Sequence, residues 1–155
     1  MTPPTLCWRS QSFHELDAAT LHAFLQLRAE VFVIEQQCIY QDVDGKDPRA
    51  HHVSAWDGEH LVAYARVLPP GVSFDEASIG RVVTSPRYRT IGAGRGLVAR
   101  SIEACEQVFG VQPIRIGAQS HLQRFYGSFG FVPCSDEYVE DGIPHIDMLR
   151  RPPNR

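Results

Sequence analysis

The order of apolar and polar positions along the chain predicts two amphipathic helices. The first begins after Asp17, a residue type that caps helices, and is expected to end near Glu35. The second runs from Arg95 to Val108 and is stopped by Gly110. The positions that define the two core-facing sides are Leu21, Phe24, Leu25, Arg28 and Phe32, and then Leu97, Val98, Ile102 and Cys105.

Shorter apolar runs, bounded by glycine, proline and polar residues, predict the strands. They cover residues 6–12, 52–56, 60–68, 79–84, 114–118, 131–134 and 146–149. Asp57 and Gly58 form a tight turn between two of them, and a short helix over residues 121–129 is closed by Gly130. A polar loop is expected over residues 41–49, and an acidic loop before the last strand.

These elements follow one another in the order β-α-β-β-β-α-β-α-β-β. This order implies a mixed sheet with helices on both faces, which is an α/β or α+β fold. The chain of 155 residues is long enough for one domain with a substantial core. We therefore expect a single domain over residues 1–155, with residues 151–155 as a frayed tail.

Charge changes this picture locally. The net charge of −3 gives no reason to expect nucleic acid or a membrane surface as a partner. Between residues 77 and 102, however, there are five arginines and no acid, which favours an anionic ligand. These arginines are Arg81, Arg87, Arg89, Arg95 and Arg100.

The cysteines predict neither a metal site nor a redox motif. Cys7, Cys38, Cys105 and Cys134 are widely spaced, lie in apolar surroundings and form no C-x-x-C pair. We interpret them as reduced, mostly buried thiols of a cytoplasmic protein. The N-terminus lacks a signal-peptide pattern, and no apolar run approaches the roughly 18 residues of a membrane span.

The most specific local pattern is R-x-x-G-x-G, which follows the strand over residues 79–84 and opens the second long helix. Glycines let backbone N–H groups approach an anion, and the first N–H groups of a helix are unpaired at the positive end of its dipole. This arrangement favours a phosphorylated ligand. A P-loop is excluded because Lys46 is the only lysine, and a Rossmann fingerprint because Leu97 replaces its third glycine.

The R-x-x-G-x-G loop after V-T-S-P resembles the pyrophosphate loop of the GNAT N-acetyltransferase superfamily. QSHLQRFYGSFGF, over residues 119–131, resembles the second motif of that superfamily. LRAEVFVIEQQCIYQDVDGKD, AYARVLPPG, IGRVVTSP and EDGIPHIDM resemble the ElaA-type subgroup, so that the resemblance covers nearly the whole chain. It implies a mostly antiparallel sheet and acetyl-CoA as co-substrate, without a metal.

The resemblance also implies roles for individual residues in binding the cofactor. The strand before the loop would bind the pantetheine arm through its backbone, and the loop would hold the pyrophosphate. Thr90 stands where many relatives carry glycine, and the usual asparagine of the second motif is absent, with Ser120 and His121 nearby. The cofactor-binding residues expected in this way are Val82, Val83, Thr84, Arg89, Thr90, Ile91, Gly92, Ala93, Gly94, Arg95 and Gln119.

Tyr126 matches the tyrosine that protonates the departing CoA thiolate in many GNAT enzymes. A tyrosine hydroxyl, with an ordinary pKa near 10, stays protonated at neutral pH and can donate. The competing interpretation is that Tyr126 and Phe125 only form the aromatic face of a packed helix.

The general base and the acceptor site are less specified. Glu35, His52 and His145 are the candidates for removing a proton from the acceptor amine. Arg28, Glu30 and Arg81 are expected to shape the acceptor site through a buried ion-pair network, and His145 to contact the acceptor. The acids of the two polar loops could attract a cationic acceptor; these are Asp42, Asp44, Asp47, Glu140 and Asp141. Val53, twelfth from Asp42, excludes a calcium loop there.

The expected activity is direct transfer of an acetyl group from acetyl-CoA to a primary amine of a small molecule or peptide. One alternative is an enzyme similar to acyl-homoserine-lactone synthases, which share the fold and use acyl-carrier protein and S-adenosylmethionine. The complete R-x-x-G-x-G loop argues against it. A second alternative is a CoA-binding module without turnover. Monomer and homodimer are both compatible with the sequence.

Overall fold

The structure is a computed structural model that describes residues 4–153. Its centre is an eight-stranded sheet in the order β1-β2-β3-β4-β5-β8-β6, with β7 paired to β8. Among the strand pairs within residues 4–153, only β4–β5 is parallel, so the mixed, mostly antiparallel α/β fold is as expected. The strands are β1 Cys7–Ser12, β2 His51–Asp57, β3 His60–Leu68, β4 Ala77–Thr84, β5 Ile114–Gln119, β6 Val132–Pro133, β7 Tyr138–Glu140 and β8 Ile143–Arg150.

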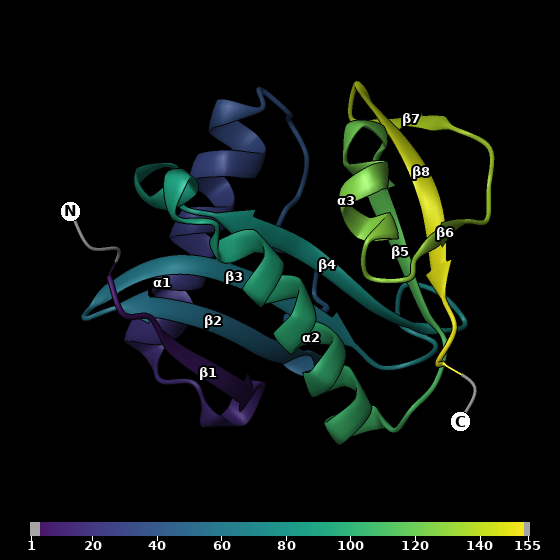
Figure 1. Cartoon of the computed structure of the whole chain (residues 1–155). Helices are drawn as coiled ribbons and strands as arrows, with labels where there is room; N and C mark the ends of the chain where they lie inside the picture. Colours follow the sequence, from purple (N-terminus) through teal and green to yellow (C-terminus); the bar gives the residue numbers. More distant parts are fainter. Residues whose placement is uncertain (1–3, 154–155) are drawn as a thin grey trace.

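Helices cover both faces of this sheet (Figure 1). The first, α1 (Ala18–Arg28), is capped by the Asp17 carboxylate, which accepts from the Thr20 N–H at 2.7 Å. It continues as a π-helical segment, η2 (Ala29–Glu35). On the other face lie α2 (Ala93–Phe109) and the short α3 (Gln123–Gly127), each preceded by a 3-10 helix. The 3-10 helices are η1 Phe13–Glu15, η3 Asp47–Arg49, η4 Pro86–Ile91 and η5 Ser120–Leu122.

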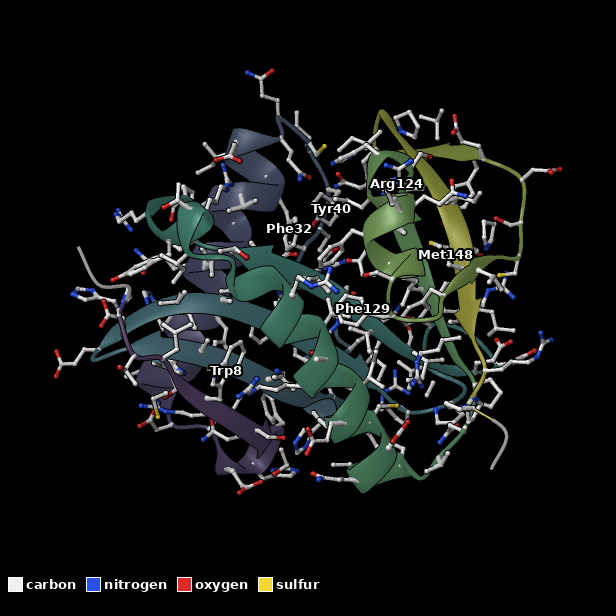
Figure 2. The ribbon with its side chains drawn as sticks, viewed as in Figure 1. Trp8, Phe32, Tyr40, Arg124, Phe129 and Met148 are labelled. Carbon is white, nitrogen blue, oxygen red and sulfur yellow. The ribbon has the colours of Figure 1, made fainter. Side chains whose placement is uncertain are left out.

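Two apolar clusters anchor the helices to the sheet. The larger cluster joins α2 and α3 to the strands, with Leu97 of α2 completely buried. Trp8 of β1 packs at the edge of this cluster, beside α2 (Figure 2). A Cβ atom added at Gly96 of α2 would lie 3.1 Å from the Trp8 ring. The smaller cluster places Phe24 of α1 against the ring of Tyr64, with centroids 4.5 Å apart. Because both faces are covered, β2 and β3 are almost entirely buried.

The sheet opens between β4 and β5. These strands pair only at their first residues, Ala77 with Ile114 and Ser78 with Arg115, and then diverge (Figure 1). A bulge in β4 sharpens the divergence, because Arg81 and Val82 together oppose one residue of β3. Arg81 adopts φ of +50°, a left-handed conformation that is unusual for a residue other than glycine. The opening therefore exposes one backbone edge of β4.

The expected acidic loop before the last strand is instead a hairpin. Tyr138–Glu140 forms β7, and β8 begins at Ile143, three residues earlier than the sequence suggested. Asp141 and Gly142 both have positive φ, which matches the twist of a two-residue hairpin turn. The D-G pair was the available signal, and the acidic composition around it obscured the turn.

Two smaller expectations also changed. Cys38 and Cys105 are buried as predicted, but Cys7 and Cys134 are exposed because they lie at or near the outer strands β1 and β6. The expected frayed tail falls partly outside the described residues, and residues 151–153 have no regular structure.

Candidate active site

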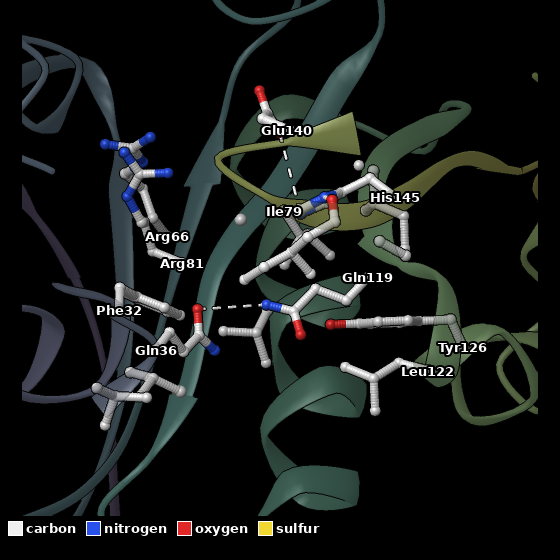
Figure 3. Close-up of a pocket in the computed structure, with 18 of the residues that line it drawn as sticks. Phe32, Gln36, Arg66, Ile79, Arg81, Gln119, Leu122, Tyr126, Glu140 and His145 are labelled. Carbon is white, nitrogen blue, oxygen red and sulfur yellow. Dashed lines mark hydrogen bonds and ion pairs between the residues drawn. The ribbon is translucent and has the colours of Figure 1, made fainter. Parts of the chain in front are cut away.

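A cavity of about 720 Å³ lies in the opening between β4 and β5. Every residue of β4 from Ser78 to Thr84 lines it, so the cavity runs along the strand. Its other walls come from η2, the loop before η3, the start of α2, the ends of β5 and α3, and the β7–β8 hairpin (Figure 3). Elements far apart in the sequence thus meet around one cleft.

One end of the cavity reaches the R-x-x-G-x-G loop. Gly92, with φ of +74°, ends η4 and starts α2, whose first turn has no side-chain cap and no acid. This contrasts with α1, which Asp17 caps. The free N–H groups of α2 are therefore available to an anion. Arg89, Ala93 and Gly94 line the cavity, whereas Thr90, Ile91, Gly92 and Arg95 do not.

The arginines of this region are not one uncompensated positive surface, as the sequence suggested. Arg89 is ion-paired with Glu35, a partly exposed residue outside the cavity wall. Arg95 lies over the ring of Phe129 at 5.1 Å, and Arg100 over that of Trp8. Glu35 thus compensates the charge of Arg89, whereas the aromatic rings orient Arg95 and Arg100 and leave their positive charges in place.

The backbone of β4 is suited to holding an extended ligand. Val83 and Thr84 pair with β3 on one side, but in the described part of the chain no strand pairs with β4 on the other side after Ser78. Val82, Val83 and Thr84 all line the cavity. Their peptide groups on the open edge can replace strand partners with ligand hydrogen bonds.

Tyr126 of α3 lies on the opposite wall. It is only 7% exposed, and its hydroxyl points into the cavity toward Gln119 (Figure 3). Burial raises the pKa of Tyr126 to about 12. Its hydroxyl is therefore protonated throughout the neutral range, as a proton donor must be. The Gln119 amide nitrogen donates to Gln36 across the cleft at 3.5 Å.

His145 of β8 also lines the cavity, next to Gln119 in the sheet register. Its Nδ1 lies 2.7 Å from the Ile143 carbonyl, which can only accept, so Nδ1 carries a proton. In the neutral ring, Nε2 is then the unprotonated nitrogen, and it lies 3.9 Å from a Glu140 carboxylate oxygen. This tautomer leaves a proton acceptor at the cavity wall.

His52, by contrast, is not at the site. Its ring is completely buried, packs against Phe24 and Tyr64, and does not line the cavity. Nε2 donates to the Asp47 carbonyl at 3.1 Å, and Nδ1 accepts from the Tyr64 hydroxyl at 2.7 Å. Burial lowers the pKa of His52 to about 4. With both nitrogens engaged inside the core, His52 is a structural residue, and its assignment as a base is wrong.

The expected ion-pair network exists, with different members. Arg28, completely buried, donates to Asp42 at 2.9 Å and to Asp47 at 2.8 Å. Arg81 pairs with Asp42 at 2.8 Å and with Asp44 at 3.3 Å. The aspartates expected to attract a cationic acceptor are therefore neutralised from within, because buried carboxylates require partners.

Arg66 completes this network and was missed by the sequence analysis. It donates to Asp44 at 2.8 Å and to Asp47 at 3.1 Å, and it lines the cavity. Its signal was a charged residue inside the otherwise apolar run of β3. Glu30 does not join: it faces a separate cavity of about 520 Å³ beside α1. Residues two apart on a helix point in different directions, which separates Glu30 from Arg28.

Among residues 4–153, no group of three or more His, Cys, Asp or Glu side chains is arranged to hold a metal ion. Within the same range, no helix is both long and apolar enough to cross a membrane.

Comparison with known proteins places this geometry in a family. The model of the acetyltransferase (GNAT) domain matches residues 16–151. The chain is 44% identical to Protein ElaA of Escherichia coli over 145 residues, which are 92% of this chain and 95% of that protein. The crystal structure of that protein superposes with a TM-score of 0.89, covering 95% of this chain and all of the other at 42% identity. An acyl-CoA N-acyltransferase from Pseudomonas aeruginosa is 44% identical, with a TM-score of 0.90, covering 94% and 99% of the two chains. The chain is an acyltransferase of the GNAT family, similar to ElaA.

Proposed function

We propose that this protein transfers an acetyl group from acetyl-CoA directly to a primary amine. The observation that carries the proposal is the single cavity that joins the uncapped start of α2, the open edge of β4 and the hydroxyl of Tyr126. An acyl-CoA needs these three features in this order: an anion site for the pyrophosphate, backbone partners for the pantetheine arm, and a proton donor near the sulfur.

The cofactor-binding roles follow from this order. The N–H groups of Ala93 and Gly94, which line the cavity, hold the pyrophosphate together with those of Gly92 and Arg95 on either side of them, and Arg89 adds charge after it separates from Glu35. Thr90 and Ile91 complete the turn of η4 that leads into α2. On the cleft walls, backbone groups of Val82, Val83 and Thr84 bind the pantetheine arm, and Gln119 borders the thioester.

The proton transfers are assigned to two residues on the walls. His145 Nε2 accepts a proton from the ammonium of the acceptor, which frees the nitrogen lone pair for attack on the acyl carbon. The new N–C bond forms as the C–S bond breaks. A backbone N–H near Val83 stabilises the negative charge on the acyl oxygen, and Tyr126 protonates the departing sulfur. The amine loses its second proton to solvent.

Acetyl-CoA binding is the direct test. A thermal-shift titration compares acetyl-CoA, acyl-carrier protein loaded with a fatty acyl chain, and S-adenosylmethionine. Acetyl-CoA at 100 times its Kd is expected to stabilise the fold by about 2.7 kcal/mol. Stabilisation by the other two ligands alone would favour the homoserine-lactone alternative. Binding of acetyl-CoA without thiol release in the presence of any amine would favour the module without turnover.

Arg89→Glu tests the loop itself. The substituted carboxylate lies where the pyrophosphate is expected, so the thermal shift with acetyl-CoA should be lost. Arg87→Glu is the matched control, since Arg87 lies outside the cavity and belongs to the same 3-10 helix. Full binding by the Arg89 variant would contradict the loop assignment.

A further inference from the structure

The geometry points to an acceptor that carries a carboxylate as well as its amine, such as an amino acid or a short peptide. This inference rests on the proposed N-acetyltransferase function and narrows its second substrate. It follows from the charges on the two walls of the cavity beyond the acyl position. In Figure 3, Arg66 and Arg81 lie on one side, and Glu140 and His145 lie on the other.

The first wall has an excess of positive charge. The buried network contains three arginines and three aspartates, which balance one another. Lys46 adds a fourth cation from the loop before η3 and lines the same cavity. Its ammonium donates to the Ser73 hydroxyl at 2.8 Å, and within residues 4–153 it is paired with no acid. One positive charge on this wall is therefore uncompensated.

Arg81 also has unused donors on this wall. Its Nε and Nη2 contact Asp42 and Asp44, whereas Nη1 donates to no residue in the described range. The side chain is 22% exposed, unlike Arg66, at 4%. The β4 bulge places Arg81 at the cavity with left-handed backbone geometry, a conformation that the surrounding contacts must maintain. Lys46 and Arg81 together provide donors for one carboxylate.

The opposite wall carries negative charge, which attracts the ammonium form of an amine. Glu140 and Asp141 line the cavity from the β7–β8 hairpin, and neither is ion-paired with a lysine or arginine of the described residues. Glu140 lies next to His145, the proposed base. The Cys38 thiol donates to the Asp141 carbonyl at 3.2 Å, which connects the tip of the hairpin to the segment that follows η2. An ammonium group is thus attracted to the side where it loses its proton.

A cavity with separated charges of opposite sign selects for a molecule with the opposite arrangement. A simple amine satisfies only the hairpin side and leaves the Lys46 ammonium without a carboxylate and Nη1 of Arg81 without an acceptor among the described residues. An acidic ligand without an amine meets Glu140 and Asp141 unfavourably. An amine with a carboxylate on the same small molecule satisfies both walls and is oriented with its nitrogen toward His145.

The test measures thiol release by the full chain with acetyl-CoA and paired acceptors. Dipeptides are compared with their C-terminal amides, because the α-amines of the two have nearly equal basicity. Free amino acids and their amides form a second set, in which the amides have the larger free-amine fraction and so bias the comparison against the prediction. The acids are expected to have kcat/KM at least about tenfold above that of the amides, since charge-assisted hydrogen bonds are the strong ones.

Lys46→Gln is the decisive variant, because among the described residues the Lys46 ammonium donates only to the Ser73 hydroxyl, so that the substitution keeps the backbone contacts and the side chains of the buried network. It should raise the KM for the acid acceptor, so that the kcat/KM of the acid divided by that of its amide falls several-fold. The KM for acetyl-CoA should stay unchanged. Arg81→Gln should act in the same direction, but it also removes contacts to Asp42 and Asp44. Arg49→Gln, an exposed residue of η3 outside the cavity wall, is the matched control and should leave the ratio as it is.

The outcomes separate this inference from the proposed function. A failure of acetyl-CoA to bind in the thermal-shift assay overturns both. If acetyl-CoA binds and amines are acetylated with equal kcat/KM for acids and amides, only the inference is wrong. If none of the panel is acetylated, calorimetric binding of the acids and amides to the CoA-bound protein decides. A preference for the acids that Lys46→Gln removes supports the inference, and equal binding or none overturns it.

Discussion

The guanidinium of Arg89 is ion-paired with the carboxylate of Glu35, which links the loop before α2 to the end of the π-helical segment η2. The sequence suggested separate roles for the two residues, one in binding a pyrophosphate and one as a general base. Their pairing indicates a competition instead: Glu35 occupies the charge that a bound pyrophosphate would use. Both side chains are nearly half exposed, so the pair contributes little to stability.

Glu35→Gln should therefore leave the affinity for acetyl-CoA unchanged or raise it by up to about fivefold, the range expected for an exposed ion pair. The kcat is expected to stay within about twofold of wild type, because Glu35 lies outside the cavity wall. Titration of acetyl-CoA and steady-state thiol release measure the two quantities. A loss of kcat by about 100-fold with normal acetyl-CoA affinity would restore Glu35 as the general base.

Tyr126→Phe should lower kcat by about 10² to 10⁴ while the Kd for acetyl-CoA stays the same. The substitution removes the hydroxyl that points into the cavity and keeps the ring that packs on Phe131, with centroids 6.0 Å apart. Thiol release and isothermal calorimetry provide the measurements. Since the pKa of Tyr126 is raised to about 12, its ionisation should produce no fall in kcat below about pH 10 in the wild-type enzyme.

Phe125→Leu is the control for packing, because the Phe125 ring contacts the Tyr126 ring and has no hydroxyl that could donate a proton. Unchanged turnover in the Tyr126 variant would show that the tyrosine is only part of the aromatic face of α3.

Protonation of His52 should make the fold less stable as the pH falls. The folded-state pKa is lowered to about 4 by burial, below the unfolded value near 6.5, so the unfolded chain binds the extra proton first. Stability from neutral His52 is complete above about pH 7 and falls as the pH decreases through 6.5 toward 4. Between pH 8 and pH 5 the free energy of unfolding in urea should drop by roughly 2 kcal/mol from this group.

His52→Gln removes this titration and should flatten the pH dependence between 7 and 5, at some cost in stability at every pH. A residual slope is expected from His51, whose pKa burial also lowers. An equal slope in the wild type and the variant would mean that His52 does not couple pH to folding.

Arg28→Met should destabilise the fold by about 3–5 kcal/mol, because it leaves the carboxylates of Asp42 and Asp47 buried beside fewer cations. Arg28→Lys keeps the charge but loses the planar set of donors that reaches both aspartates and the Asp42 carbonyl. It should recover only part of the loss. Urea unfolding followed by circular dichroism measures both, and a Met variant as stable as wild type would contradict a structural role for the network.

Several features of the site could be predicted from local sequence. Asp17 caps α1 and Gly110 ends α2 as predicted, because capping and positive φ depend on one residue and its immediate neighbours. The start of α2 at Ala93 lies two residues before the predicted Arg95. Tyr126 and Gln119 also lie at the cleft, where the motif resemblance implied. Their proposed roles still depend on the experiments above.

Side-chain partners could not be predicted in the same way. His52 and His145 have similar sequence surroundings, at the start of a strand after a polar loop. His52 is nevertheless buried against Phe24, whereas His145 lines the cavity. The difference is which face of which strand each residue occupies and what covers that face. Arg66 was missed for the same reason, since its partners lie about 20 residues away in the preceding loop.

The sequence alone determined the order of elements apart from β7, the glycine loop and the family resemblance, because these depend on periodicity, turn chemistry and contiguous motifs. Only the tertiary structure decided where the charges cancel. It paired the loop aspartates with Arg28, Arg66 and Arg81, and among residues 4–153 it gave Lys46 on the cavity wall no carboxylate partner. Pairing energies depend on distance and burial, and both are set by how β3, β4 and the preceding loop come together in space.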